Sequence, residues 1–283
     1  MVFAKVSVHG GHSGTYCSHA KDPLEAIVQR YVEQGFEWCC LTEHIPPINP
    51  SLIPPEENSE GYDCDALHNR FDAYFLEAKL LQKKYADQID IYVGFETEAY
   101  SDYEVLVQRL IDRHKPQMIV GSVHHLKDFM IDGPREQYVK ALDAFGNIEN
   151  LYCAYFDKQL ELINRFRPAV VGHFDLIRMH DAQYMERWSV PEIRDRALRN
   201  LKRIKELGLV LDLNVRSYTK EAKEPYLSEP WLRIAIREEM KIALGDDSHG
   251  IINVGQYLEE GVAFLRKLGG KTEWAKPTLW DYD

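Results

Sequence analysis

The segment EWCCLTEH, residues 37–44, is an apolar run that leads directly into Thr42, Glu43 and His44. Six other short apolar runs occur along the chain. Several of them are apolar on both faces, which is typical of strands in a parallel sheet covered by helices. The seven runs cover residues 5–9, 37–41, 89–95, 117–122, 169–172, 207–213 and 241–244. We therefore expect each of these runs to be a strand of one parallel sheet.

Amphipathic segments separate the apolar runs. After Asp22-Pro23, apolar residues recur at helical spacing, and proline is favoured in the first turn of a helix; they are Leu24, Ile27, Val28 and Tyr31. Further helices are predicted over residues 67–85, 103–113, 152–165, 191–207, 230–239 and 254–268. This repeated alternation of strands and helices indicates an α/β fold, either a barrel or a doubly wound sheet.

The chain is expected to form one domain over residues 1–283. Its length suits a single α/β barrel, and no Gly/Ser-rich or charge-rich linker interrupts it. The one long irregular segment is residues 46–61, which contains five prolines and follows the second predicted strand. We interpret it either as a loop over an active-site mouth or as a surface excursion without a function.

The composition excludes several classes of partner. Because 45 Asp and Glu outnumber 34 Lys and Arg, the formal net charge is −11, which argues against a nucleic-acid partner. No apolar run is long enough to span a membrane, and no signal peptide is predicted. The five cysteines include an adjacent pair but no CxxC motif, which favours free thiols in a cytoplasmic protein.

Ionisable side chains stand at nearly every predicted strand end. The ends carry His9-Gly10-Gly11-His12, Thr42-Glu43-His44, Glu96-Thr97-Glu98, His124-His125, His173-Phe174-Asp175, Asp212-Leu213-Asn214 and Asp246-Asp247-Ser248-His249. In a parallel barrel the carboxyl ends of the strands meet at one face, so these groups would converge. Burying them without partners would be costly, and bound cations would satisfy them. Mixed imidazole and carboxylate ligands suit zinc, iron or manganese.

The chain resembles the polymerase and histidinol phosphatase (PHP) family through motifs that occur in the family's order. They are HSG (12–14) with His19, LTEHIP (41–46), GFE (94–96), GSVHH (121–125), VGHFDLIR (171–178), EPY (224–226) and DDSHG (246–250). The resemblance extends from His9 to Gly255. It implies a distorted, TIM-like barrel of seven strands, with a trinuclear metal site at the C-terminal ends of the strands.

The resemblance also implies which residues bind the divalent metal ions. The first ion would be bound by His9, His12, Glu96 and Asp247. Glu96 would bridge to a second ion, which would also be bound by His124 and His173. The third ion would be bound by His19, His44 and His249.

The first pair of histidines departs from the family pattern. The family usually has His-x-His, whereas His9 and His12 are separated by Gly10 and Gly11. Regular strand alternation would point the two imidazoles to opposite faces. A bulge at the glycines would restore their convergence.

The reaction implied by the resemblance is hydrolysis of a phosphomonoester. A metal-bridging hydroxide would attack phosphorus, and an arginine would help to stabilise charge on the phosphoryl oxygens. Arg178 is the first candidate for that arginine. A second arginine of the family has Thr219 at its position here, where the nearest basic residues are Arg216 and Lys220.

Protonation of the leaving alkoxide requires an acid within hydrogen-bond reach. Asp175, Asp246 and His125 are the candidates, and the sequence does not choose between them. Asp175 or Glu43 would alternatively orient ligand imidazoles.

The leading hypothesis, implied by the resemblance, is a histidinol-phosphate phosphatase of histidine biosynthesis. The first alternative is the same chemistry on another small phosphate ester, such as a nucleotide or sugar phosphate. A second alternative is a non-catalytic or polymerase-associated PHP module. A third is metal-dependent hydrolysis of a carbon–nitrogen bond in the style of the amidohydrolases. The sequence leaves the oligomeric state open.

Overall fold

A computed structural model, which describes residues 3–282, contains the seven predicted strands in one parallel sheet. The order of the strands in the sheet follows the chain. They are β1 (Lys5–Ser7), β2 (Phe36–His44), β3 (Asp90–Glu96), β4 (Met118–Gly121), β7 (Val170–Val171), β8 (Val210–Asn214) and β9 (Ile242–Gly245). Two further strands, β5 (His125–Leu126) and β6 (Phe129–Met130), pair as a separate antiparallel hairpin.

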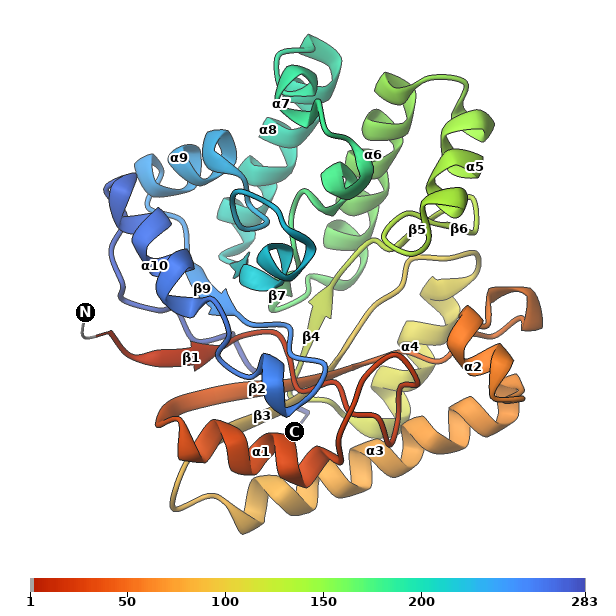
Figure 1. Cartoon of the computed structure of the whole chain (residues 1–283), viewed down its shortest axis with the longest axis vertical. Helices are drawn as coiled ribbons and strands as arrows, with labels where there is room; N and C mark the ends of the chain where they lie inside the picture. The colour runs from red at the N-terminus through yellow and green to blue at the C-terminus, as the bar shows by residue number, and fades with distance from the viewer. Residues whose placement is uncertain (1–2, 283) are drawn as a thin grey trace.

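The sheet curls until its first and last strands meet. Beyond the end of β1, the backbone N–H of Val8 donates to the carbonyl of Leu244 at 2.7 Å. The N–H of Asp247 donates to the carbonyl of His9 at 2.8 Å. A doubly wound sheet would leave these two edges apart, so the barrel prediction is confirmed. Figure 1 shows the helices arranged around the central strands.

Helices follow most strands and cover the outside of the barrel. The α-helices are α1 (Leu24–Glu33), α2 (Pro55–Ser59), α3 (Cys64–Lys84), α4 (Tyr103–His114), α5 (Arg135–Phe145), α6 (Ile148–Phe166), α7 (Tyr184–Arg187), α8 (Pro191–Leu207), α9 (Glu229–Arg237) and α10 (Leu258–Lys267). Short 3₁₀ helices are η1 (Pro50–Leu52), η2 (Leu176–His180), η3 (Val215–Lys220) and η4 (Ile251–Asn253).

Helix α8 illustrates how the sequence specifies these elements. It begins with a proline, which fits the first turn because that turn needs no backbone donor. Residues at helical spacing bury one face; they include Ile193, Ala197, Leu201 and Ile204. Gly208 caps the C-terminus of the helix with φ +65°. Glycine adopts this left-handed conformation at little cost because it has no side chain.

Several elements were not predicted from periodicity. Helix α6 begins at Ile148 rather than at residue 152, because the Asn147 side chain accepts a hydrogen bond from the backbone N–H of Asn150 and caps the helix. Helix α5 and the β5–β6 hairpin fill the long connection after β4. Within residues 46–61, which we expected to be irregular, η1 and α2 provide short helical turns.

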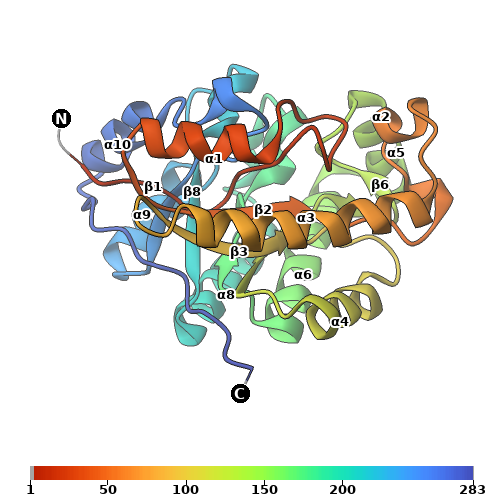
Figure 2. The same cartoon turned by 90° about the horizontal axis from the view of Figure 1, so that it is seen from below.

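The C-terminal segment after α10 covers the end of the barrel opposite the predicted site. Trp274 Nε1 donates to the carbonyl of Ala4 at 2.8 Å, and the N–H of Trp280 donates to the carbonyl of Gln117 at 2.8 Å. Ala4 and Gln117 immediately precede β1 and β4. The segment therefore crosses the N-terminal ends of strands on opposite sides of the barrel (Figure 2).

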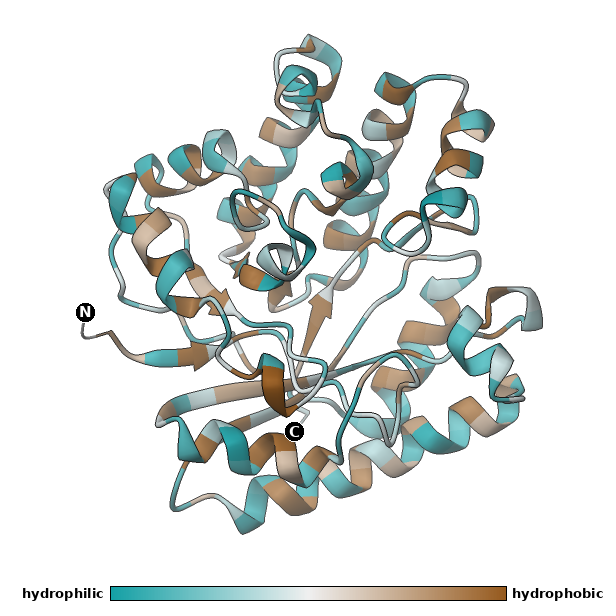
Figure 3. Ribbon diagram, in the orientation of Figure 1, coloured by the Kyte–Doolittle hydropathy of each residue, from teal (hydrophilic) through white to brown (hydrophobic). Residues whose placement is uncertain are grey.

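Apolar side chains fill the barrel and the layer between strands and helices. In Figure 3 the helices alternate hydrophobic and hydrophilic stripes, as expected for elements that bury one face. No helix among residues 3–282 is long and apolar enough to cross a membrane.

We expect the buried face of the sheet to dominate stability. Leu211 of β8 is fully buried, and Leu211→Ala should lower the free energy of unfolding by about 2–5 kcal/mol through lost burial and a residual cavity. Leu76 of α3 is 69% exposed, so Leu76→Ala should change it by less than about 0.5 kcal/mol. Urea denaturation of both variants tests the pair, and equal effects would contradict this assignment of the core.

Candidate metal centre

The carboxyl ends of the strands bring the predicted ligands together. His9 and His12 follow β1, His44 ends β2, and Glu96 ends β3. His124 follows β4, His173 follows β7, and Asp247 and His249 follow β9. His19 lies in the loop after β1. Parallel strands present these ends at one face, so residues distant in sequence become neighbours. All except His19 and His44 are buried.

Glu96 lies at the centre of the cluster. Its Oε2 atom is 3.0 Å from His9 Nε2, and its Oε1 atom is 2.9 Å from His173 Nε2. His124 Nε2 is 3.3 Å from Oε1, and His44 Nδ1 is 3.3 Å from Oε2. The two carboxylate oxygens therefore face different imidazoles, so Glu96 could be a ligand to two cations.

Asp247 forms a second corner of the cluster. Its Oδ1 atom lies 3.4 Å from His12 Nε2, 3.5 Å from His249 Nδ1 and 4.0 Å from His9 Nε2. Burial favours the neutral acid, but His9 and His12 hold the pKa of Asp247 well below its usual value. Burial and Arg216 lower the pKa of His249, so its imidazole is neutral near pH 7 and can offer a lone pair.

A third corner lies toward the loop that follows β1. His19 Nε2 is 3.3 Å from His44 Nε2, and the ring centroids of His19 and His249 are 5.1 Å apart. Cys17 Sγ lies 3.0 Å from His19 Nδ1. The structure thus gathers these three predicted ligands beside a thiol that the sequence did not single out.

Several buried polar atoms of the cluster make no well-oriented hydrogen bond to any described residue, although some of them lie within 4.0 Å of an ionisable partner. They are His9 Nε2, His12 Nε2, His124 Nδ1, His173 Nδ1 and Asp247 Oδ1. Buried polar atoms are nearly always paired, so such a concentration needs an explanation. The ligand atoms of His9, His12 and Glu96 lie within 4.8 Å of one another, as do those of His9, His173 and Asp247. Divalent cations of the zinc, iron or manganese type fit this donor set.

The two-glycine spacing between His9 and His12 is resolved by a break in the strand. Strand β1 ends at Ser7, and Gly11 adopts φ +77°. Both imidazoles consequently reach Glu96, at 3.0 and 3.8 Å. A Cβ atom on Gly11 would lie 2.5 Å from a methyl of Leu41. The two imidazoles therefore converge beyond the end of the strand, in a segment where Gly11 is left-handed, and not through a bulge within β1.

Carboxylates behind the ligands orient the imidazoles. Asp212 Oδ2 is 2.9 Å from His9 Nδ1, and Glu43 Oε1 is 3.4 Å from His12 Nδ1. Glu98 Oε1 is 2.7 Å from His44 Nδ1. Such partners fix the ring orientation of a metal-binding histidine. The sequence alone assigned no role to Asp212 or Glu98. Both nevertheless lie at strand ends, Asp212 two residues before Asn214 and Glu98 two residues after Glu96.

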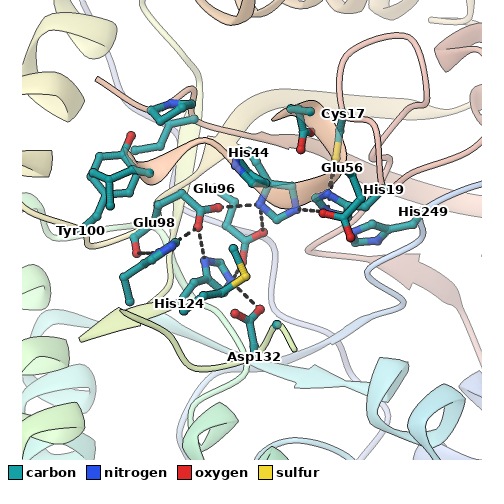
Figure 4. Close-up of a pocket in the computed structure, with 18 of the residues that line it drawn as sticks. Cys17, His19, His44, Glu56, Glu96, Glu98, Tyr100, His124, Asp132 and His249 are labelled. Carbon is teal, nitrogen blue, oxygen red and sulfur yellow. Dashed lines mark hydrogen bonds and ion pairs between the residues drawn. The ribbon is translucent and has the colours of Figure 1, made fainter. Parts of the chain in front are cut away.

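A cavity of about 250 Å³ opens onto the cluster (Figure 4). His44, Glu96, His124, His173, Asp247 and His249 line its polar wall. Residues 46–61 contribute Pro46, Pro47, Leu52, Pro54, Glu56 and Glu57 to another wall. The segment therefore forms part of the cavity wall beside the cluster.

The predicted substrate-binding and catalytic residues divide into two groups. Arg216, Lys220 and His125 line the cavity. Arg178 and Asp175 are not among the described residues that line it. Arg178 is 5% exposed and donates to the carbonyls of Glu224 and Pro225, and Asp175 is fully buried and accepts from the backbone N–H groups of Leu227 and Ser228.

Known proteins share this sequence pattern and fold. A sequence model described as the PHP domain matches residues 10–216. The "Probable histidinol-phosphatase" of Schizosaccharomyces pombe is 34% identical over 93% of this chain and 87% of its own length. The "Histidinol-phosphatase" of Saccharomyces cerevisiae is 30% identical over 87% of this chain and 84% of its own length.

Solved structures extend the similarity to three dimensions. A candidate histidinol phosphatase from Listeria monocytogenes superimposes with a TM-score of 0.79 at 21% identity, covering 90% of this chain and 99% of its own. A histidinol phosphate phosphatase from Lactococcus lactis, crystallised with zinc, L-histidinol and phosphate, gives a TM-score of 0.68 at 20% identity, covering 99% of this chain and 100% of its own. At these identities the likeness concerns the fold.

Removing the charge of the central carboxylate should weaken metal binding. Glu96→Gln keeps the shape of the side chain but loses the anion that faces two pairs of imidazoles, so we expect metal affinity to fall by more than about tenfold. Glu37→Gln, at an exposed position of β2, is the matched control and should retain the wild-type metal content. Elemental analysis after dialysis measures the metal content of both variants. Full metal content in Glu96→Gln would contradict the assignment of Glu96 as a metal ligand.

Proposed function

The chain belongs to the PHP domain family, and from this premise we propose that it is a metal-dependent phosphomonoesterase that converts L-histidinol phosphate to L-histidinol and phosphate in histidine biosynthesis. The observation that carries the proposal is the buried cluster of imidazoles and carboxylates beside a cavity that Arg216 and Lys220 also line. Curated relatives with histidinol phosphatase names support the choice of substrate.

Three divalent cations are proposed for the cluster, and Glu96 would be a ligand shared by two of them. When bound, such cations lower the pKa of water and neutralise charge on phosphoryl oxygens. The protein's part is to hold the donor atoms in place. Asp212, Glu43 and Glu98 do so by hydrogen bonding the far nitrogens of His9, His12 and His44.

Arg216 and Lys220 are better placed than Arg178 to contact the phosphate. Arg216 Nη1 donates to the carbonyl of Asp247 at 3.0 Å, which keeps the guanidinium beside a predicted metal ligand. The Arg178 guanidinium instead lies between the rings of Tyr184 and Tyr226, 4.8 Å from each centroid. Its charge is already engaged by backbone carbonyls, and Tyr226, not Arg178, lines the cavity.

His125 is the best-placed acid for the leaving group. Its Nδ1 atom is 3.2 Å from the carbonyl of Glu98, and its ring lines the cavity. Asp175 uses both oxygens to accept backbone N–H groups. The Asp246 carboxylate accepts hydrogen bonds from Ser7, Tyr31 and the Gly255 N–H, and burial raises its pKa to about 6. Asp246 is not among the described residues that line the cavity. We therefore assign proton donation to His125.

The substrate is tested by a panel of phosphate esters. The metal-loaded enzyme should hydrolyse L-histidinol phosphate with a kcat/KM at least about a hundredfold above that for a nucleoside monophosphate or a sugar phosphate, because catalytic sites discriminate through contacts made by the whole substrate. Release of inorganic phosphate measures each rate. A higher kcat/KM for one of the other esters would identify a different PHP phosphatase.

The two arginines should differ in what their loss affects. Arg216→Ala should lower kcat/KM about a hundredfold, since it removes a charged donor to the phosphoryl group, while metal content stays unchanged. Arg178→Ala should instead lower the free energy of unfolding by roughly 1–3 kcal/mol, because buried carbonyls and Asp175 lose a charged partner. Kinetics and thermal unfolding separate the two. A purely kinetic defect in Arg178→Ala would assign the phosphate to that residue.

A further inference from the structure

Asp132 is a cavity carboxylate that the metal cluster does not use. It follows the β5–β6 hairpin, lines the cavity and keeps 25% of its side chain exposed. Its Oδ2 atom is 4.0 Å from His124 Nε2, and Figure 4 shows it directed toward that ring. Its oxygens accept no hydrogen bond from any other residue between 3 and 282. Nothing in the sequence singles out Asp132, since it stands in an irregular connection.

The hairpin that precedes Asp132 is well defined. Its turn consists of Lys127 and Asp128, with φ values of +49° and +64°. Two left-handed residues in a two-residue turn match the right-handed twist of the paired strands. Asp128 accepts hydrogen bonds from the Ser101 N–H and hydroxyl, both at 2.7 Å. The hairpin is thereby fixed to the loop that follows β3.

The backbone on either side of Asp132 is also held. The N–H of Ile131 donates to the carbonyl of His124 at 2.8 Å. His180 Nε2 donates to the carbonyl of Gly133 at 2.9 Å. Asp132 is therefore a carboxylate on a fixed backbone whose own oxygens remain available to a ligand in the cavity.

The cavity carries its positive and negative groups on different elements. Arg216 and Lys220 belong to η3, whereas Asp132 follows β6 and two further carboxylates of the lining, Glu56 and Glu57, belong to α2. Lys220 and Asp132 attract one another, but within the described chain no ion pair of 4.0 Å or less joins them. A ligand with an anionic and a cationic end could therefore satisfy both sides at once.

We propose that Asp132 binds the ammonium group of the substrate and makes the enzyme selective for aminoalkyl phosphates. This inference rests on the proposed function, because L-histidinol phosphate carries its ammonium on the carbon next to the ester CH₂. A group that binds this ammonium must lie close to the phosphate site. Asp132, beside the predicted metal ligand His124, meets that requirement.

A double comparison of enzyme and substrate tests the proposal. The substrates are L-histidinol phosphate and its deamino analogue, 3-(imidazol-4-yl)propyl phosphate, which differ only in the amino group. The wild-type enzyme should show a KM lower by roughly tenfold to a hundredfold for the aminated substrate, as expected for one charged hydrogen bond. In Asp132→Asn the ratio of the two KM values should fall to about one, with little change in kcat or in KM for the analogue.

Metal content and a matched variant distinguish the other roles open to Asp132. Asp132→Asn should retain the wild-type metal content, and Asp143→Asn, at an exposed position of α5, should leave both KM values unchanged. Lost metal would make Asp132 a ligand, and an equal fall in kcat on both substrates would make it the leaving-group acid; either result overturns the proposal. An unchanged preference in Asp132→Asn overturns it while leaving the proposed function intact. A wild-type enzyme that prefers the analogue overturns both.

Discussion

The burial of two carboxylates among imidazoles is the constraint on which the site depends. Glu96 and Asp247 are 1% and 6% exposed, and an isolated carboxylate at such a position would take up a proton. Burial pushes the pKa of Glu96 upward, but His9 and His124 hold it well below its usual value, while the pKa values of those two histidines are raised. A ligand imidazole must be neutral, so divalent cations and protons compete for the same ring nitrogens.

Parallel topology is what makes this cluster predictable from sequence. His9, Glu96 and His173 are far apart along the chain, yet each stands at or just after the carboxyl end of a strand. Seven apolar runs were sufficient to predict seven strands. Because the strands of a barrel are parallel, their carboxyl ends lie at one face. The strand ends alone predict that these polar groups converge, whereas the assignment of individual residues as metal ligands came from the resemblance to the PHP family.

Residues whose role depends on local geometry could not be predicted in the same way. Asp132 follows a hairpin of two-residue strands, too short to produce a periodic pattern. Arg178 occupies a family motif, but only the structure reveals that it lies behind Tyr226 and donates to backbone carbonyls. Residues 268–282 form no helix or strand, so their path across the barrel follows from tertiary contacts such as that of Trp274.

Selectivity has to arise from the walls of the cavity, because a metal cluster would bind the phosphate of any ester. Much of the wall beyond the metal cluster comes from elements outside the seven-stranded sheet, among them the segment 46–61, α3, the β5–β6 hairpin, η2 and η3. Apolar side chains form part of them, including Leu52, Phe71, Met130 and Leu176. An imidazole ring could lie against this surface while Asp132 and Arg216 bind opposite charges. The barrel would then supply the chemistry, and the short elements at its mouth would determine which phosphate ester reaches it.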